Sequence, residues 1–184
     1  MKRGIRIIRL LFFAASICAC AGPSPRKVVA QTWLNSNNIT THYSPKFFTE
    51  LMERKAKNNI TVFKDDTVTK GTAVAYVQQY VIATVDESLK KVEKIPVKPD
   101  TKALVHASLE VFRYGKEVFE NDYLTIATMI DEKQPTETIE AAIDQLFAKH
   151  DAEMQARLDR LDSYAIPYAE KHNIPTHHVN SQPR

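Results

Sequence analysis

The sequence has very few cysteines and glycines, and these shortages exclude several classes of protein. Its only cysteines are Cys18 and Cys20, so a domain that follows them contains neither a disulfide nor a thiolate metal site. The four glycines are too scattered to form a phosphate-binding loop. The nucleophile elbow, HExxH, CxxCH and the Glu-x-x-His pairs of di-iron bundles are absent as well. We therefore expect no cofactor and no enzymatic activity.

The main hydrophobic run is also short, which indicates an export signal rather than a membrane-spanning helix. It reads LLFFAASICAC from Leu10 to Cys20, whereas a spanning helix needs roughly 20 apolar residues. Four basic residues and no acidic residue precede the run, and Ala21-Gly22-Pro23 follows it. This order of charged, apolar and small residues is typical of a secretory signal.

The end of this signal resembles the lipobox of bacterial lipoproteins. In Ile17-Cys18-Ala19-Cys20, an aliphatic residue stands three before the last cysteine and a small residue just before it. Cys18 departs from the pattern, because a small or aliphatic residue is usual there. The resemblance implies that residues 1–19 are removed, that Cys20 is lipidated, and that the membrane is a partner through this anchor.

The residue after the modified cysteine influences sorting in that family. Ala21 stands there instead of the aspartate that retains lipoproteins in the inner membrane. The resemblance therefore implies an outer membrane lipoprotein that faces the periplasm or the cell surface. The alternative is ordinary cleavage after Ala21, which would give a soluble periplasmic or secreted protein.

Basic charge is not in excess once the signal is removed. The whole chain has a formal net charge of +3. Residues 1–19 hold four basic groups and no acidic one, and subtracting four from +3 leaves −1 for the remainder. We therefore expect no nucleic-acid partner.

Apolar residues that recur every three to four positions predict an all-α fold. We expect residues 58–66 to form a loop, because a lone strand without a partner is not stable. Ser44 is expected to cap the first long helix, and Pro167 to kink or end the last one. The predicted helices cover residues 44–56, 69–94, 100–131 and the stripe from Ile139 to Tyr168.

These helices predict an elongated antiparallel bundle of three to four helices, with an N-terminal tether and a polar C-terminal tail. Two prolines and a glycine in residues 21–27 indicate the tether. Gly115 costs a helix about 1 kcal/mol relative to alanine, so it indicates a close helix contact, with a flexible hinge as the alternative. The expected parts are a signal peptide (1–19), an anchored tether and N-terminal segment (20–43), the bundle domain (44–172) and a flexible tail (173–184).

Candidate binding residues fall into two groups. A pocket between helices could be lined by His150 together with the tyrosines Tyr76, Tyr80, Tyr114 and Tyr123. His150 alternatively fits a core histidine that is hydrogen-bonded to a tyrosine or a carbonyl. Near the C-terminus, three imidazoles could bind zinc or copper or lie in a disordered tail, namely His172, His177 and His178. Trp33 is expected to plug the core, with a binding hot spot as the alternative.

Two classes of function follow from these features. The first is a noncatalytic, lipid-anchored protein of the bacterial envelope that binds an unknown envelope or secreted protein or supports the envelope. An immunity lipoprotein that neutralises a toxin is one form of this class. The second is a periplasmic carrier of a small ligand or a metal, which requires an open cavity with polar tips pointing into it.

Overall fold

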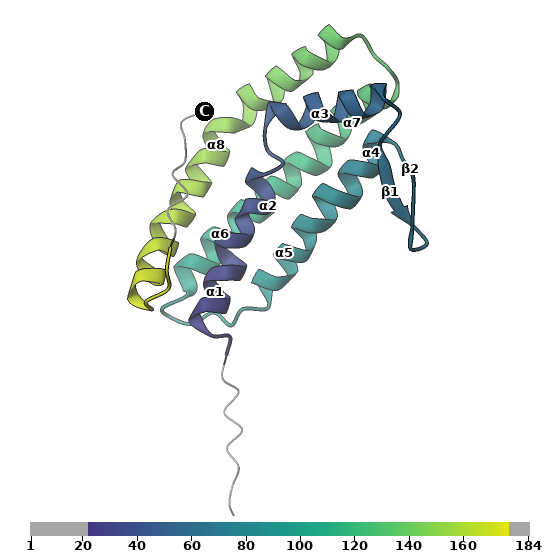
Figure 1. Cartoon of the computed structure of the whole chain (residues 1–184). Coiled ribbons are helices and arrows are strands. Elements are labelled where there is room, and N and C mark those ends of the chain that lie inside the picture. Colours follow the sequence, from purple (N-terminus) through teal and green to yellow (C-terminus); the bar gives the residue numbers. More distant parts are fainter. Residues whose placement is uncertain (1–21, 177–184) are drawn as a thin grey trace, which may run out of the picture.

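The computed structural model describes residues 22–176 and shows a mostly helical fold with one small β-hairpin (Figure 1). Two π-helical segments, η2 (Val77–Ile82) and η3 (Phe119–Tyr123), join α4 to α5 and α6 to α7. The helices are α1 (Pro25–Thr32), the 3-10 turn η1 (Leu34–Ser36), α2 (Asn37–Thr40), α3 (Pro45–Ala56), α4 (Ala73–Tyr76), α5 (Ala83–Glu93), α6 (Lys102–Val118), α7 (Leu124–Asp131) and α8 (Thr136–Lys171). The strands are β1 (Thr61–Lys64) and β2 (Thr67–Lys70). The expectation of a helical protein is therefore confirmed, and the hairpin is a correction to it.

Helix α6 is central to the packing. It contacts α8 on one side and α5 on the other, and α1 contacts all three; Figure 1 shows these helices side by side. A Cβ atom built on Gly115 of α6 would lie 2.6 Å from Cδ1 of Ile39 in α2. The predicted close contact at Gly115 is therefore confirmed, and α2 is the neighbour that needs the space.

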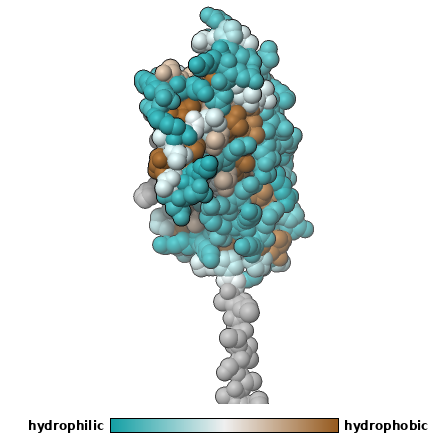
Figure 2. Space-filling view, turned by 90° about the vertical axis from the view of Figure 1, so that its right-hand side faces the viewer, coloured by the Kyte–Doolittle hydropathy of each residue, from teal (hydrophilic) through white to brown (hydrophobic). Residues whose placement is uncertain are grey.

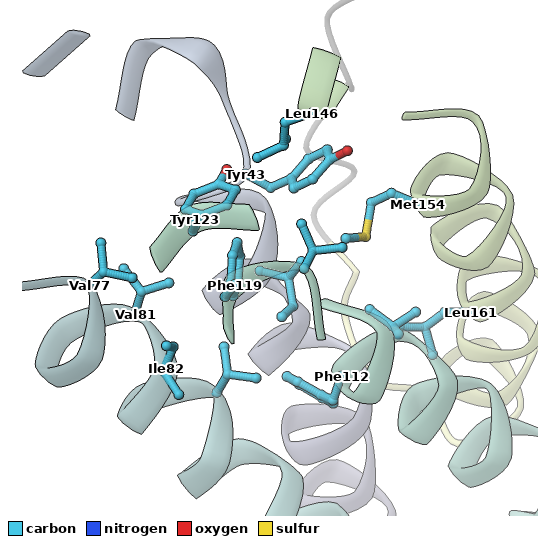
Figure 3. Close-up of a cluster of buried hydrophobic side chains, with 14 of the residues drawn as sticks. Tyr43, Val77, Val81, Ile82, Phe112, Phe119, Tyr123, Leu146, Met154 and Leu161 are labelled. Atoms are coloured by element: carbon cyan, nitrogen blue, oxygen red, sulfur yellow. The ribbon is translucent and has the colours of Figure 1, made fainter. Parts of the chain in front are cut away.

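One apolar cluster forms the core, and Figure 3 shows side chains from η2, α6, η3 and α8 meeting in it. The largest fully buried side chains include four aromatic residues, Phe48, Phe112, Phe119 and Tyr123. The ring centroid of Tyr123 lies 4.5 Å from that of Phe48 and 4.7 Å from that of Phe119. Aromatic contacts of this kind add to the gain from burial, so the contact between Tyr123 and Phe48 helps to hold η3 against α3.

The hairpin corrects two predictions from the sequence. Strands β1 and β2 pair in antiparallel register, with Phe63 opposite Val68. We predicted a loop over residues 58–66, but Thr61–Lys64 within it forms β1, and the helix that we expected from Thr69 begins at Ala73 instead. The second half of β2, Thr69 and Lys70, lay within the predicted helix 69–94, so β1 had no visible partner.

The N-terminal segment is more ordered than the sequence indicated. Helix α1 begins at Pro25, within the stretch 21–27 that we expected to be a tether. Ser24 caps it through its side chain, and Val28 and Val29 are buried in the core. Among the described residues, only 22–24 precede this helix, so the domain begins earlier than we predicted.

The remaining helix predictions are confirmed, with differences at the helix ends. Ser44 stands at the cap position of α3, but its side chain makes no capping hydrogen bond. Its carbonyl instead accepts a hydrogen bond of 3.1 Å from the N–H of Phe47. Helix α8 runs past Pro167 to Lys171, so this proline does not end the helix.

The start of α1 and the hairpin lie toward opposite ends of the helical body (Figure 1). Within residues 22–176, no helix is both long and apolar enough to cross a membrane. The predicted signal and Cys20 lie outside the described residues.

Candidate functional site

The residues predicted to line one pocket lie in three separate places. Tyr76 and Tyr80 are neighbours beside the hairpin, with ring centroids 4.8 Å apart. Tyr123 is buried in the aromatic core. Tyr114 and His150 contact each other between α6 and α8. These side chains therefore do not form a common lining.

His150 is the centre of a partly buried polar network that joins α6, η3 and α8. Its Nδ1 lies 2.8 Å from Oη of Tyr114 and its Nε2 lies 3.1 Å from Oδ2 of Asp122. A neutral imidazole has one donor and one acceptor nitrogen. If Nε2–H donates to the Asp122 carboxylate, Nδ1 accepts the hydrogen bond from the Tyr114 hydroxyl. The predicted hydrogen bond from His150 to a tyrosine is confirmed, and Asp122 is a second partner.

The surroundings of Tyr114 favour a neutral phenol. Burial, followed by the nearby Glu153 carboxylate, raises the pKa of Tyr114 above its ordinary value. The Arg157 guanidinium lies 4.7 Å from the centroid of the Tyr114 ring and pairs with Glu153 at 2.7 Å. A neutral phenol is a hydrogen-bond donor, so Tyr114 can donate to Nδ1 of His150 and join α6 to α8.

Asp122 is a member of this network that the sequence did not single out. The π-helical segment η3 places it opposite α8, although the stretch Glu120–Asp122 looked only like a polar interruption of an apolar stripe. Such segments occur often at functional sites because the wider turn changes the direction of side chains. The available signal was an acidic residue within an otherwise buried helix face.

An open hollow of about 400 Å³ lies next to this network. It is polar, with charges of both signs and no aromatic side chain, whereas sites for small molecules are mostly apolar. None of the five predicted pocket residues lines it. The lining residues are Glu120, Asn121, Asp122, Leu124, Thr125, Thr128 and Lys149.

The predicted C-terminal metal site can be described only at His172. The ring centroid of His172 lies 4.5 Å from that of Tyr168, and its buried Nε2 has no hydrogen-bond partner among the described residues. His177 and His178 lie outside the described residues. Within residues 22–176, no group of three or more His, Cys, Asp or Glu side chains is placed to hold a metal ion.

Trp33 packs against the core as the plug interpretation expects. Its side chain is partly buried. Its indole Nε1–H donates a hydrogen bond of 2.6 Å to Oδ1 of Asp162, which joins the N-terminal segment to α8.

The hairpin carries the most exposed large apolar side chains of residues 22–176. Phe63 is 56% exposed and Val68 is 61% exposed, and they stand directly opposite each other on the two strands. Directly opposed residues share one face of a sheet. Figure 2 shows the side of the molecule that carries the hairpin, where apolar residues gather among hydrophilic ones. Exposed apolar strands are sites of pairing with other chains.

Gln79 covers one edge of the hairpin. Its side-chain Oε1 accepts a hydrogen bond of 2.7 Å from the N–H of Phe63, and its Nε2 donates one of 2.8 Å to the carbonyl of Phe63. These two bonds replace those that a neighbouring strand would make to β1. The other strand, β2, has no further strand beside it in the described part of the chain. No sequence signal pointed to Gln79.

Asp131 at the end of α7 fixes the base of the hairpin. Its Oδ1 accepts hydrogen bonds from Nζ of Lys55 at 2.5 Å and from the N–H of Ala73 at 2.9 Å, and its Oδ2 accepts one of 3.0 Å from the N–H of Val74. Burial alone raises the pKa of this carboxyl, but Lys55 and the two N–H groups outweigh burial and hold the pKa of Asp131 below its ordinary value. The carboxylate thus caps α4 directly after β2.

Comparison with known proteins adds no family to this picture. The chain matches no protein-family model, no curated protein and no solved structure. The exposed apolar pair and the one uncovered edge make the hairpin the candidate binding site.

Proposed function

We propose that this chain is an exported, lipid-anchored and noncatalytic protein of the bacterial envelope that binds a protein partner through its hairpin. The observation that carries the proposal is the exposed pair Phe63 and Val68 beside the uncovered edge of β2. Gln79 and Asp131 hold the hairpin in place before a partner arrives. A fixed edge of this kind suits strand addition, in which main-chain hydrogen bonds give affinity and neighbouring side chains give specificity.

The position of α1 supports an anchor at the end of the molecule opposite the hairpin. A lipid on Cys20 would join the body next to α1, away from the end where the hairpin is attached (Figure 1). The helices would then form an elongated antiparallel bundle that acts as a spacer. Helix α8 alone has 36 residues, which corresponds to about 54 Å at 1.5 Å per residue. The proposed place is the outer membrane, and an immunity-type lipoprotein is one form that such a binding protein takes.

The carrier alternative has less support. A carrier needs polar side chains that converge on one cavity. Tyr76, Tyr114 and Tyr123 lie in different places, and both ring nitrogens of His150 already have partners.

The hairpin is tested by capture of partners from native envelopes. The full chain is cross-linked in cells, and the captured proteins are quantified for the wild type and for the double variant Phe63→Ser/Val68→Ser. We expect the double variant to lose a specific partner, because it removes the exposed apolar pair but leaves the helical core intact.

Val97→Ser is the matched control, because Val97 is also exposed but lies in the connection between α5 and α6. Its captured proteins should equal those of the wild type. The same captured proteins from the hairpin variant and from this control would contradict binding through the hairpin.

A further inference from the structure

We propose that β2 pairs edge to edge with β2 of a second copy of this chain, forming a four-stranded antiparallel sheet with a two-fold axis at Val68. This inference rests on the proposed function, because it takes the hairpin as the binding element and names its partner. It is carried by the arrangement of the main-chain groups at the edge and by the order of side chains along β2.

The main-chain groups of Val68 point to the uncovered edge. In an antiparallel ladder, opposed residues either exchange both hydrogen bonds with each other or point both groups outward. Phe63 gives its N–H and its carbonyl to Gln79, outside the hairpin. The pair Phe63 and Val68 is therefore of the outward type, and the N–H and C=O of Val68 lie on the opposite edge. Two copies placed about Val68 can exchange both of these hydrogen bonds.

In this arrangement the side chains of β2 in one copy match those of β2 in the second copy. The segment Asp66-Thr67-Val68-Thr69-Lys70 has an acidic residue two before Val68 and a basic residue two after it. Antiparallel pairing about Val68 places Thr67 of each copy opposite Thr69 of the other, and it brings Lys70, the last residue of β2, next to the turn residue Asp66 of the other copy. Opposite charges across strands stabilise a sheet, and here they form two equivalent pairs.

The ammonium of Lys70 has donors to spare for this role. It already donates a hydrogen bond to the carbonyl of Asn58 in its own chain. An ammonium has three donors, so it retains N–H groups for the carboxylate of a second copy. The contact with Asn58 also orders the lysine side chain before pairing.

The pairing also extends the apolar surface across the new sheet. Phe63 lies opposite Val68 within each hairpin, and Val68 would lie opposite Val68 across the axis. Four apolar side chains then form one row on a single face. A shift of two residues in either direction would place Val68 opposite a charged residue and break both ion pairs, so the side chains select one register.

The proposed lipid anchor would allow two copies to pair through a contact as small as one edge of β2. Strand β2 has four residues, and stable interfaces commonly bury roughly 1,200–2,000 Å². We therefore expect weak pairing in dilute solution and stronger pairing on a membrane, where the lipid anchor raises the effective concentration.

Proximity is tested first, with Val68→Cys in the full chain in its native membrane. Hydrogen-bonded opposite residues have Cα atoms about 5.5 Å apart, which is within the range for a disulfide. We expect Val68→Cys to form a covalent dimer under mild oxidation. Val97→Cys is the exposed control, and the wild type shows any bridging through Cys18 or Cys20. A dimer yield no higher for Val68→Cys than for Val97→Cys would overturn the proposal.

Charge complementarity is tested by a swap between two variants, each also carrying Val68→Cys. Lys70→Asp alone or Asp66→Lys alone makes the opposed positions alike in charge, so we expect roughly tenfold less dimer. Coexpression of the two restores opposite charges in the mixed pair, and we expect a heterodimer at close to the wild-type yield. Thermal unfolding confirms that each variant is folded.

The outcomes separate this inference from the proposed function. Absence of the heterodimer with folded variants overturns pairing between copies. If a different envelope protein is then still lost in the Phe63→Ser/Val68→Ser variant, the hairpin binds that protein and the proposed function stands.

Discussion

At the scale of single residues, position 115 needs a glycine because the side chain of Ile39 packs directly against it. A methyl group at this position would contact Cδ1 of Ile39 at 2.6 Å. Gly115→Ala should therefore destabilise the fold by about 1–3 kcal/mol through overpacking, although alanine gains about 1 kcal/mol in helix propensity. The free energy of unfolding from urea titration measures the change.

Ile39→Val supplies the matching test, because it removes the methyl group that clashes. Alone, it should cost about 1 kcal/mol. In the Gly115→Ala background it should cost less or even stabilise the protein, so the two changes are not additive. Strict additivity would mean that the contact between these residues does not limit the packing.

Tyr114 is the second residue whose role can be measured. Tyr114→Phe removes the hydroxyl that bonds Nδ1 of the buried His150. We expect a loss of about 1–3 kcal/mol, because a buried acceptor is left without its partner. Tyr164→Phe is the control on an exposed ring and should change stability by less than about 0.5 kcal/mol. If Tyr114→Phe and the wild type have equal free energies of unfolding, the hydrogen bond between Tyr114 and His150 does not stabilise the fold.

At the scale of elements, Asp131 links α7 to the start of α4 and makes that link dependent on pH. Its pKa is lower in the folded protein than in the unfolded chain. The stabilisation is therefore complete above the unfolded pKa and is lost as the pH falls toward the folded pKa. Asp131→Asn should cost about 2 kcal/mol near pH 7 and progressively less below about pH 4.

Urea unfolding at neutral and acidic pH measures this difference. Asp144→Asn, on the exposed face of α8, should match the wild type at both pH values. If the difference in the free energy of unfolding between the wild type and Asp131→Asn stays the same at acidic pH, the substitution acts through packing and not through charge.

The elements also show what the sequence could predict. The stripe from Ile139 to Tyr168 follows the period of a helix over many turns, so α8 was clear. The hairpin was missed because Thr69 and Lys70 of β2 fell within the predicted helix 69–94, while Asp65 and Asp66, which adopt positive φ at its turn, are a weaker turn signal than Asp-Gly. Contacts such as Gln79 with Phe63 join different elements, and local periodicity contains no information about them.

At the scale of the whole molecule, the proposed lipid anchor on Cys20 would decide where the hairpin works. Cys20→Ser should move the full chain from the membrane fraction to the soluble fraction, because it removes the thiol that would carry the proposed lipid. Cys18→Ser is the control, since it retains the cysteine that resembles the lipidation site. Fractionation followed by immunoblotting measures both. If Cys20→Ser remains in the membrane, lipidation is excluded as the means of attachment.

The amide of Gln79 has a consequence for stoichiometry. A hairpin with two open edges could add neighbours without limit, as strands do in fibrils. In this protein the side chain of Gln79 occupies one edge in the manner of a strand that ends the sheet. Assembly through the remaining edge is then isologous and stops at two copies. A single glutamine would thus protect a crowded membrane surface from filament growth.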